Sequence, residues 1–176
     1  MSLEDLGNIG EFVAAVGVIV SLIYLAIQIR RNTGSVRAAT FQGVSKDWQD
    51  WMYSVSQSET FPLFYKGCFD PTSLNDMEGV QFWLQIRALF RGYENDHYQY
   101  SQGTFDASAW EGYRESLRND ILSVPGIRAV WMLDRQNYSK AFAEFIGQEL
   151  RSVRTRESFG IAEGITALMR SEKPTG

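Results

Sequence analysis

One uncharged run near the N-terminus constrains the fold of this chain more than any other feature. Residues 12–29 read FVAAVGVIVSLIYLAIQI, and Arg30 and Arg31 close the run. As a helix this segment rises about 27 Å, close to the hydrocarbon thickness of a bilayer. It is apolar on all sides, as membrane spans are, rather than along one stripe. The run therefore predicts a single transmembrane helix, with residues 1–31 forming the N-terminal tail and anchor.

Two other structures can produce an apolar run of this length. A helix buried in a soluble core would have one polar side, which this run lacks. A cleaved signal peptide would have a basic leader and a small-residue cleavage site. The leader here is acidic, with Glu4, Asp5 and Glu11. We therefore favour the membrane helix over both alternatives.

The charges that flank the run predict its orientation. Lys and Arg close to a membrane span remain on the cytoplasmic side. None precedes the run, whereas Arg30, Arg31 and Arg37 follow it. We expect the short N-terminus to cross the membrane and the rest of the chain to be cytoplasmic. The single cysteine, Cys68, fits a reducing compartment.

Small and polar residues recur along one face of the predicted anchor at alternating spacings of three and four. A 3.5-residue repeat keeps one face of a helix toward a partner helix, and small residues let two backbones approach closely in lipid. We therefore predict self-association through this face, although a partner membrane protein, or chance recurrence of common residues, would account for the same pattern. We call the face the seam, and it consists of Gly7, Gly10, Ala14, Gly17, Ser21, Tyr24 and Gln28.

The rest of the chain has the length and composition of one compact helical domain. The full chain has 176 residues, a net charge of −4 and 14% aromatic residues. A negative chain gives no reason to expect a nucleic-acid partner, and the aromatic content favours a packed core over a disordered tail. We expect a cytoplasmic helical domain over residues 32–155 and a weakly helical or disordered tail over residues 156–176.

Helical spacing of apolar residues continues beyond the anchor and predicts an all-α fold. The first amphipathic helix follows the anchor directly, and its aromatic stripe is expected to form core or subunit contacts rather than a ligand site. Whether residues 32–35 are a hinge or continuous helix is left open. A bundle of four or five further helices is expected to pack on this one. The predicted boundaries are N-caps at Ser73, Asp106 and Ser139, a first turn at Pro125 and a helix end at Gly103.

Several segments together carry a resemblance to other proteins: residues 22–33, 92–95, 98–100, 103–110 and 125–128, together with Trp131. In these segments the chain resembles a broad group of uncharacterised bacterial proteins that have one N-terminal membrane helix and a helical domain. This resemblance implies a location in the bacterial inner (plasma) membrane with the soluble domain in the cytoplasm, and it implies no activity.

One short motif carries metal-ligand spacing. Glu94 and His97 form Glu-x-x-His, which places a carboxylate and an imidazole on one helix face in di-iron bundles. Such a bundle needs a second copy of the motif, and the chain has one histidine, so the copy would have to come from another subunit. We expect His97 to be a core or interface residue, and we expect no metal or other cofactor.

No motif for nucleophilic catalysis or phosphate binding is present in the sequence, so we predict a non-enzymatic protein without catalytic residues. Glu11, at the start of the apolar run, is expected to be an ordinary charge at a helix N-terminus. In an oligomer, copies of Glu11 would instead form an acidic ring that attracts cations.

The favoured function is therefore a self-associating, membrane-anchored scaffold or accessory subunit, with the lipid bilayer and a second copy as its partners. One alternative is a small homo-oligomeric channel. Another is a membrane-tethered sensor or enzyme that uses Glu94 and His97.

Overall fold

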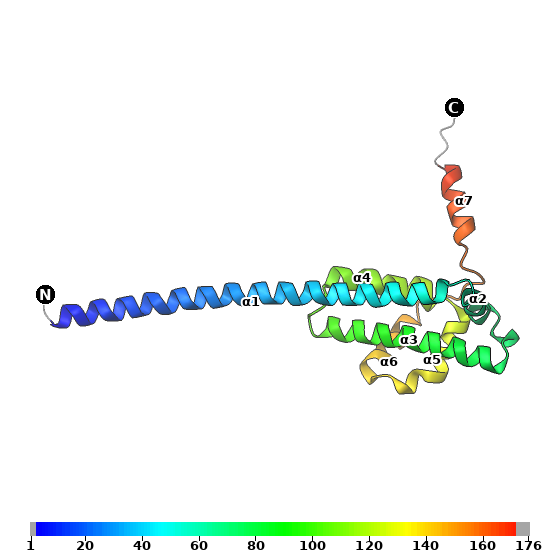
Figure 1. Ribbon diagram of the computed structural model, residues 1–176, viewed down its shortest axis with the longest axis horizontal. Coiled ribbons are helices and arrows are strands. Elements are labelled where there is room, and N and C mark those ends of the chain that lie inside the picture. The colour runs from blue at the N-terminus through cyan, green and yellow to red at the C-terminus, as the bar shows by residue number, and fades with distance from the viewer. Residues whose placement is uncertain (1–2, 172–176) are drawn as a thin grey trace, which may run out of the picture.

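The computed structural model describes the backbone of residues 3–171 and the side chains of residues 10–170. These residues form seven α-helices and no strand, which confirms the all-α prediction. One long helix, α1 (Leu3–Ser56), carries a compact bundle against its C-terminal half, while its N-terminal half extends away from the bundle (Figure 1).

Helix α1 is continuous through residues 32–35, the segment whose conformation the sequence left open. Its 54 residues form one helix. The Thr33 hydroxyl donates to the carbonyl oxygen of Ile29 at 2.9 Å, and the Ser35 hydroxyl donates to that of Arg31 at 3.1 Å. The apolar run and the bundle are therefore joined by helix rather than by a hinge.

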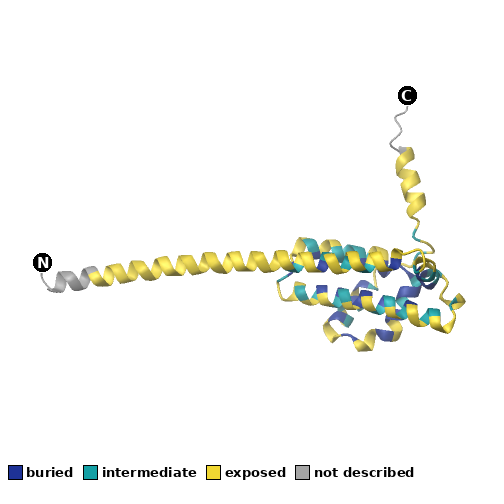
Figure 2. Cartoon of the chain, in the orientation of Figure 1, coloured by how far each residue is buried: buried dark blue, intermediate teal, exposed yellow. Residues whose placement is uncertain are grey.

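The part of the chain that the structure describes contains one helix long and apolar enough to cross a membrane. This helix is the Gly10–Ser56 part of α1, in which an 18-residue window has a mean hydropathy of 2.5 and none of the window is buried. Figure 2 shows the apolar run of residues 12–29 as exposed along its whole length. The length and composition of α1 thus agree with the predicted anchor.

Five helices make up the bundle. Three of them, α2, α3 and α4, contact the C-terminal half of α1. A π-helical turn at Leu117–Ile121 continues α4. The last helix, α7 (Ile161–Ser171), projects away from the bundle at the end far from the N-terminus (Figure 1). The bundle helices are α2 (Phe61–Phe69), α3 (Asp76–Ser101), α4 (Ala107–Ser116), α5 (Pro125–Asp134) and α6 (Lys140–Glu149).

Most helix boundaries follow the predicted capping residues. Asp106 and Ser139 accept backbone N–H bonds as N-caps, and Pro125 occupies a first turn. Gly103 follows α3 with a φ of +70°, a conformation that favours glycine.

The predicted cap of α3 at Ser73 is wrong, because Ser73 lies in a separate 3₁₀ turn, Pro71–Ser73. The actual cap is Asn75, whose side chain accepts from the N–H of Glu78 at 3.0 Å while Glu78 accepts from the N–H of Asn75 at 2.8 Å. This reciprocal pair satisfies two backbone donors at once, so it outcompetes a single serine.

The core is aromatic and is built around α3, α5 and α6. Its largest fully buried side chains include Trp131, Tyr93, Phe90 and Phe142. Helix α1 contributes the buried residues Val44 and Val55. The C-terminal half of α1 is thus part of the fold of the bundle.

Candidate functional site

The seam is an uncovered face of α1. Within the described side chains all of its residues are exposed, and Gly7 lies outside the part whose side chains the structure describes. No atom lies within 4 Å of the position that a Cβ would take at Gly10 or at Gly17. Small residues therefore leave a shallow strip on α1 that no described segment of the same chain fills.

The polar groups of the seam are bonded within α1 itself. The Ser21 hydroxyl donates to the carbonyl oxygen of Gly17 at 2.8 Å, and the Gln28 amide nitrogen donates to the hydroxyl oxygen of Tyr24 at 2.8 Å. Bonds within the helix reduce the cost of placing these groups in lipid. The bond from Gln28 uses the oxygen of Tyr24, so the hydroxyl proton of Tyr24 remains available to an acceptor on a second helix.

The seam lies on the side of α1 opposite the bundle. Residues 18 apart point in the same direction on an α-helix, because 18 residues make five full turns. Gly17 is therefore aligned with Tyr53, which is 70% exposed, and Gln28 is aligned with Lys46, whose side chain is 72% exposed. By the same rule, Val44 on the buried face aligns with Ala26. The bundle consequently leaves the seam accessible along the full length of the apolar run.

The charged residues at the two ends of the run lie in different directions. Glu11 is exposed and follows Gly10, so it points about 100° away from that residue of the seam. Arg30 and Arg31 are both exposed at the other end. Helix geometry thus places Glu11 beside the seam rather than on it.

Glu94 and His97 have structural partners within the bundle. Glu94 accepts from the N–H of Ser139 at 2.6 Å and pairs with Arg91 at 2.5 Å, so it ties α3 to the start of α6. His97 stacks on Phe145, with 4.8 Å between ring centroids, and burial lowers its pKa. No group of three or more His, Cys, Asp or Glu suited to a metal occurs among the residues described.

A cavity beside α1 is the feature that sequence reasoning missed. The aromatic stripe of α1 was expected to be core or subunit contact, and Val44 and Val55 are indeed buried. Trp48 and Trp51, however, are only half-buried and line an open cavity between α1 and α4. Helical spacing identifies the face on which such residues lie, but it cannot show that the opposing helix leaves space there.

Scans against protein-family models, curated proteins and solved structures find no match to this chain. The two surfaces described above, the seam and the cavity, therefore have to be interpreted from their own chemistry.

Proposed function

We propose that this protein is a single-pass, membrane-anchored scaffold that self-associates through α1 and holds its helical bundles together on the cytoplasmic face of the membrane. The observation that carries this proposal is the position of the seam. The small residues Ala14, Gly17 and Ser21 are exposed, they lie within the apolar run, and they face away from the bundle. Two copies that met through this face would keep their bundles on the outer sides of the pair.

The chemistry of the seam supports association in lipid. Lipid tails and leucine are equally apolar, so membrane helices associate through close packing and hydrogen bonds between helices. Gly10, Ala14 and Gly17 supply the close approach, and Tyr24 supplies a hydroxyl donor toward the other end of the run. Because α1 continues as helix into the bundle, a fixed contact in the membrane would also fix the spacing of the two bundles.

The charge pattern supports the orientation and the location. Arg30, Arg31 and Arg37 all follow the apolar run, which favours a cytoplasmic bundle. The resemblance to bacterial proteins of the same layout supports the inner membrane as the location.

The mass of the full chain in mild detergent tests the association. We expect a dimer or larger assembly that Gly17→Leu and Ala14→Leu disrupt, because a leucine on the seam separates the two backbones. Ala26→Leu is the matched control, since it makes the same change on the opposite side of α1 and should leave the mass unaltered. A monomeric native chain would overturn both the scaffold and the channel alternative. Equal effects of Ala14→Leu and Ala26→Leu on the mass would show that the contact does not lie on the seam.

Labelling of single cysteines tests the orientation. Burial raises the pKa of Cys68 to about 12, so the native thiol does not compete for a thiol reagent. In spheroplasts an impermeant maleimide should label Ser2→Cys directly and Ser58→Cys only after permeabilisation. The reverse pattern would place the bundle outside the cytoplasm.

A further inference from the structure

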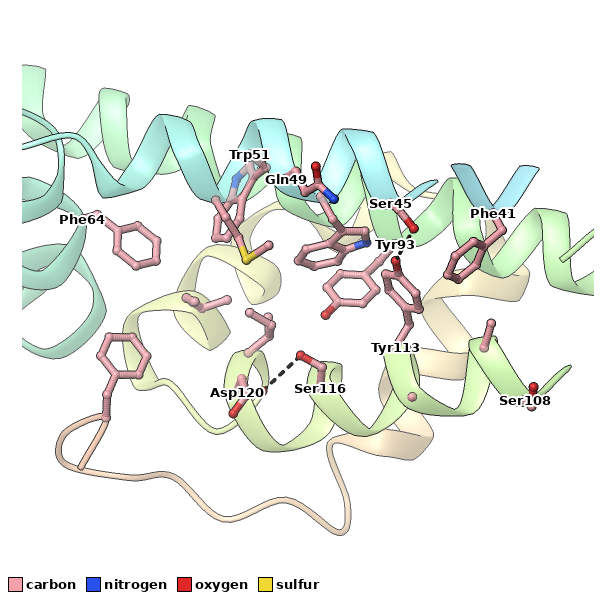
Figure 3. Close-up of a pocket in the computed structure, with 17 residues that line it drawn as sticks. Phe41, Ser45, Gln49, Trp51, Phe64, Tyr93, Ser108, Tyr113, Ser116 and Asp120 are labelled. Carbon is pink, nitrogen blue, oxygen red and sulfur yellow. Dashed lines mark hydrogen bonds between the residues drawn. The ribbon is translucent and has the colours of Figure 1, made fainter. Parts of the chain in front are cut away.

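A cavity of about 730 Å³ lies between α1, α4 and the π-helical turn Leu117–Ile121. This volume is within the range of small-molecule sites, about 300–1,000 Å³. Figure 3 shows side chains from several elements converging on one space. The walls are mainly apolar, and their aromatic side chains include Phe41, Trp48, Trp51, Phe64, Tyr113 and Phe159.

The hydroxyl of Tyr93 points into this cavity without a hydrogen-bond partner (Figure 3). Tyr93 is 0% exposed, and burial raises the pKa of its hydroxyl well above the ordinary value. The Ser116 side chain is close enough to act on that pKa, yet its hydroxyl is outside hydrogen-bond geometry. Buried polar groups are almost always bonded, so an unpaired hydroxyl in the wall of a cavity indicates a missing partner.

The π-helical turn forms part of the cavity wall. The N–H of Leu122 bonds to the carbonyl oxygen of Leu117 at 2.8 Å, the wide spacing that defines this turn. Such turns occur frequently at functional sites. Here Ser116 and Asp120 lie at the turn and line the cavity, and the Ser116 hydroxyl donates to Asp120 at 3.1 Å.

The charges of the lining select against an anionic ligand. No Lys, Arg or His lines the cavity within the described residues. Its one charged residue is Asp120, which is already paired with Arg156 at 3.4 Å. An anion would therefore find no counter-charge, and a cation would have to compete with Arg156. Aromatic walls and one buried, unpaired hydroxyl suit a flat, uncharged molecule with a polar group.

We propose that this cavity binds an uncharged, mainly aromatic small molecule whose polar group hydrogen-bonds to Tyr93. The ligand packs against the aromatic side chains that line the cavity, and its polar group replaces the partner that the Tyr93 hydroxyl lacks. This site is independent of the seam and of self-association.

The test uses 2-naphthol as the probe and the full chain in nanodiscs, with the change in tryptophan fluorescence as the readout, to which Trp48 and Trp51 in the cavity wall contribute. Naphthalene has the same rings without the hydroxyl, and 2-naphthoate adds a negative charge. We expect 2-naphthol to bind, naphthalene to bind roughly 3- to 10-fold more weakly, as the loss of one net hydrogen bond predicts, and 2-naphthoate not to bind.

Three variants separate the contributions to binding. Tyr93→Phe should weaken the binding of 2-naphthol by the same factor and leave the affinity for naphthalene unchanged. It should also raise the Tm of the unliganded protein, because it removes a buried hydroxyl that has no hydrogen-bond partner. Tyr98→Phe is the matched control on an exposed part of α3 and should change none of these. Gly112→Leu adds a side chain to the cavity wall and should abolish binding of both uncharged probes.

Equal affinities for 2-naphthol and naphthalene, or no effect of Tyr93→Phe on either, would overturn the role of Tyr93. Failure of the native chain to bind either uncharged probe would overturn the site. Ile165 lies on α7, and Ile165→Asp places a charge on that helix. If the probes bound only to this variant, α7 would occupy the cavity of the native chain in solution, and the proposal would be overturned.

Discussion

The indole nitrogen of Trp48 on α1 donates a hydrogen bond to Oδ2 of Asp96 on α3, at 3.0 Å. Asp96 is 2% exposed, and burial raises its pKa to about 6. The ring of Trp48 also packs edge-on against Tyr93, with 4.5 Å between centroids. The contact that fastens α1 to the bundle therefore lies next to the cavity and contains a carboxyl group that titrates near neutral pH.

Replacing Asp96 by Asn should remove a pH dependence of stability. The carboxyl group titrates near pH 4 in the unfolded chain and near pH 6 in the folded chain, so the folded state binds the proton more tightly. Its contribution is fully present below about pH 4 and falls by about 3 kcal/mol as the pH rises through 6. Asp96→Asn keeps an acceptor for Trp48 without a charge, and should unfold at higher denaturant concentration than the native chain at pH 8.

Guanidinium unfolding of the full chain in detergent, followed by tryptophan fluorescence at pH 4.5 and pH 8, measures this effect. Asp50→Asn is the control, because Asp50 is exposed and pairs with Lys46 at the surface. A loss of stability in Asp96→Asn at both pH values would show that the charged form of the bond to Trp48 outweighs the cost of burying the carboxylate.

Gly126 should not tolerate alanine. A Cβ at Gly126 would lie 1.8 Å from the carbonyl oxygen of Gly67, so α5 would have to move away from α2. Such overpacking costs about 1–3 kcal/mol or more. Gly92→Ala on α3 is the matched control, since nothing lies within 4 Å of its added Cβ, and it should stabilise by about 0.5–1 kcal/mol. Thermal unfolding compares the two, and an equal Tm for both variants would contradict the close contact between α2 and α5.

The sequence predicted the helices well because their signals are local. Apolar spacing and capping residues such as Asp106 and Ser139 depend on neighbours within one or two turns, and they identified the elements of the bundle. Ser73 failed as a cap because Asn75 and Glu78 form a reciprocal pair two residues later. A capping rule that considers one residue at a time cannot detect such a pair.

The interior polar groups could not be predicted, because their partners are distant in the chain. Arg114 on α4 and Arg118 in the π-helical turn both reach the buried carboxylate of Glu149, more than 30 residues later in the chain. The unpaired hydroxyl of Tyr93 depends likewise on how α1 packs over α3 and α4. The sequence showed an aromatic at that position, and only the three-dimensional packing leaves it facing a cavity.

Glu149 should be the most sensitive charged residue of the bundle. It is 5% exposed and lies 2.8 Å from Arg114 and 3.1 Å from Arg118, the latter an ion pair without hydrogen-bond geometry at Nε. Glu149→Gln removes the buried counter-charge of both arginines, which then keep only their exposed partners, Glu111 for Arg114 and Glu115 for Arg118. Because about a third of each arginine side chain is exposed to water, we expect a loss of about 1–3 kcal/mol rather than the larger cost of a fully buried pair.

Glu144→Gln is the matched control for that substitution. Glu144 pairs with Lys140 at 3.9 Å on the surface, where such pairs contribute about 0–1 kcal/mol. Denaturant unfolding at pH 7 should separate the two variants clearly, and similar midpoints would mean that water replaces Glu149 as the partner of both arginines.

Continuity of α1 at Gly34 should fix the orientation of the bundle relative to the apolar run. No atom lies within 4 Å of a Cβ at Gly34, so alanine fits there and should stabilise the helix by about 1 kcal/mol. Proline at the same position removes a backbone donor and clashes with the preceding turn, at a cost of about 3 kcal/mol. Gly34→Ala should therefore keep α1 straight, whereas Gly34→Pro should bend it between the run and the bundle.

Spin labels at Ile27→Cys and Gln42→Cys measure this directly, with unlabelled protein added to suppress distances between copies. The two positions are about 22 Å apart along an ideal helix. We expect one narrow distance distribution in the Gly34 protein and in Gly34→Ala, and a broad or shortened one in Gly34→Pro. A broad distribution already present with Gly34 would mean that residues 32–35 act as a hinge. In that case a seam contact in the membrane could hold two bundles near each other, but it could not set their relative orientation.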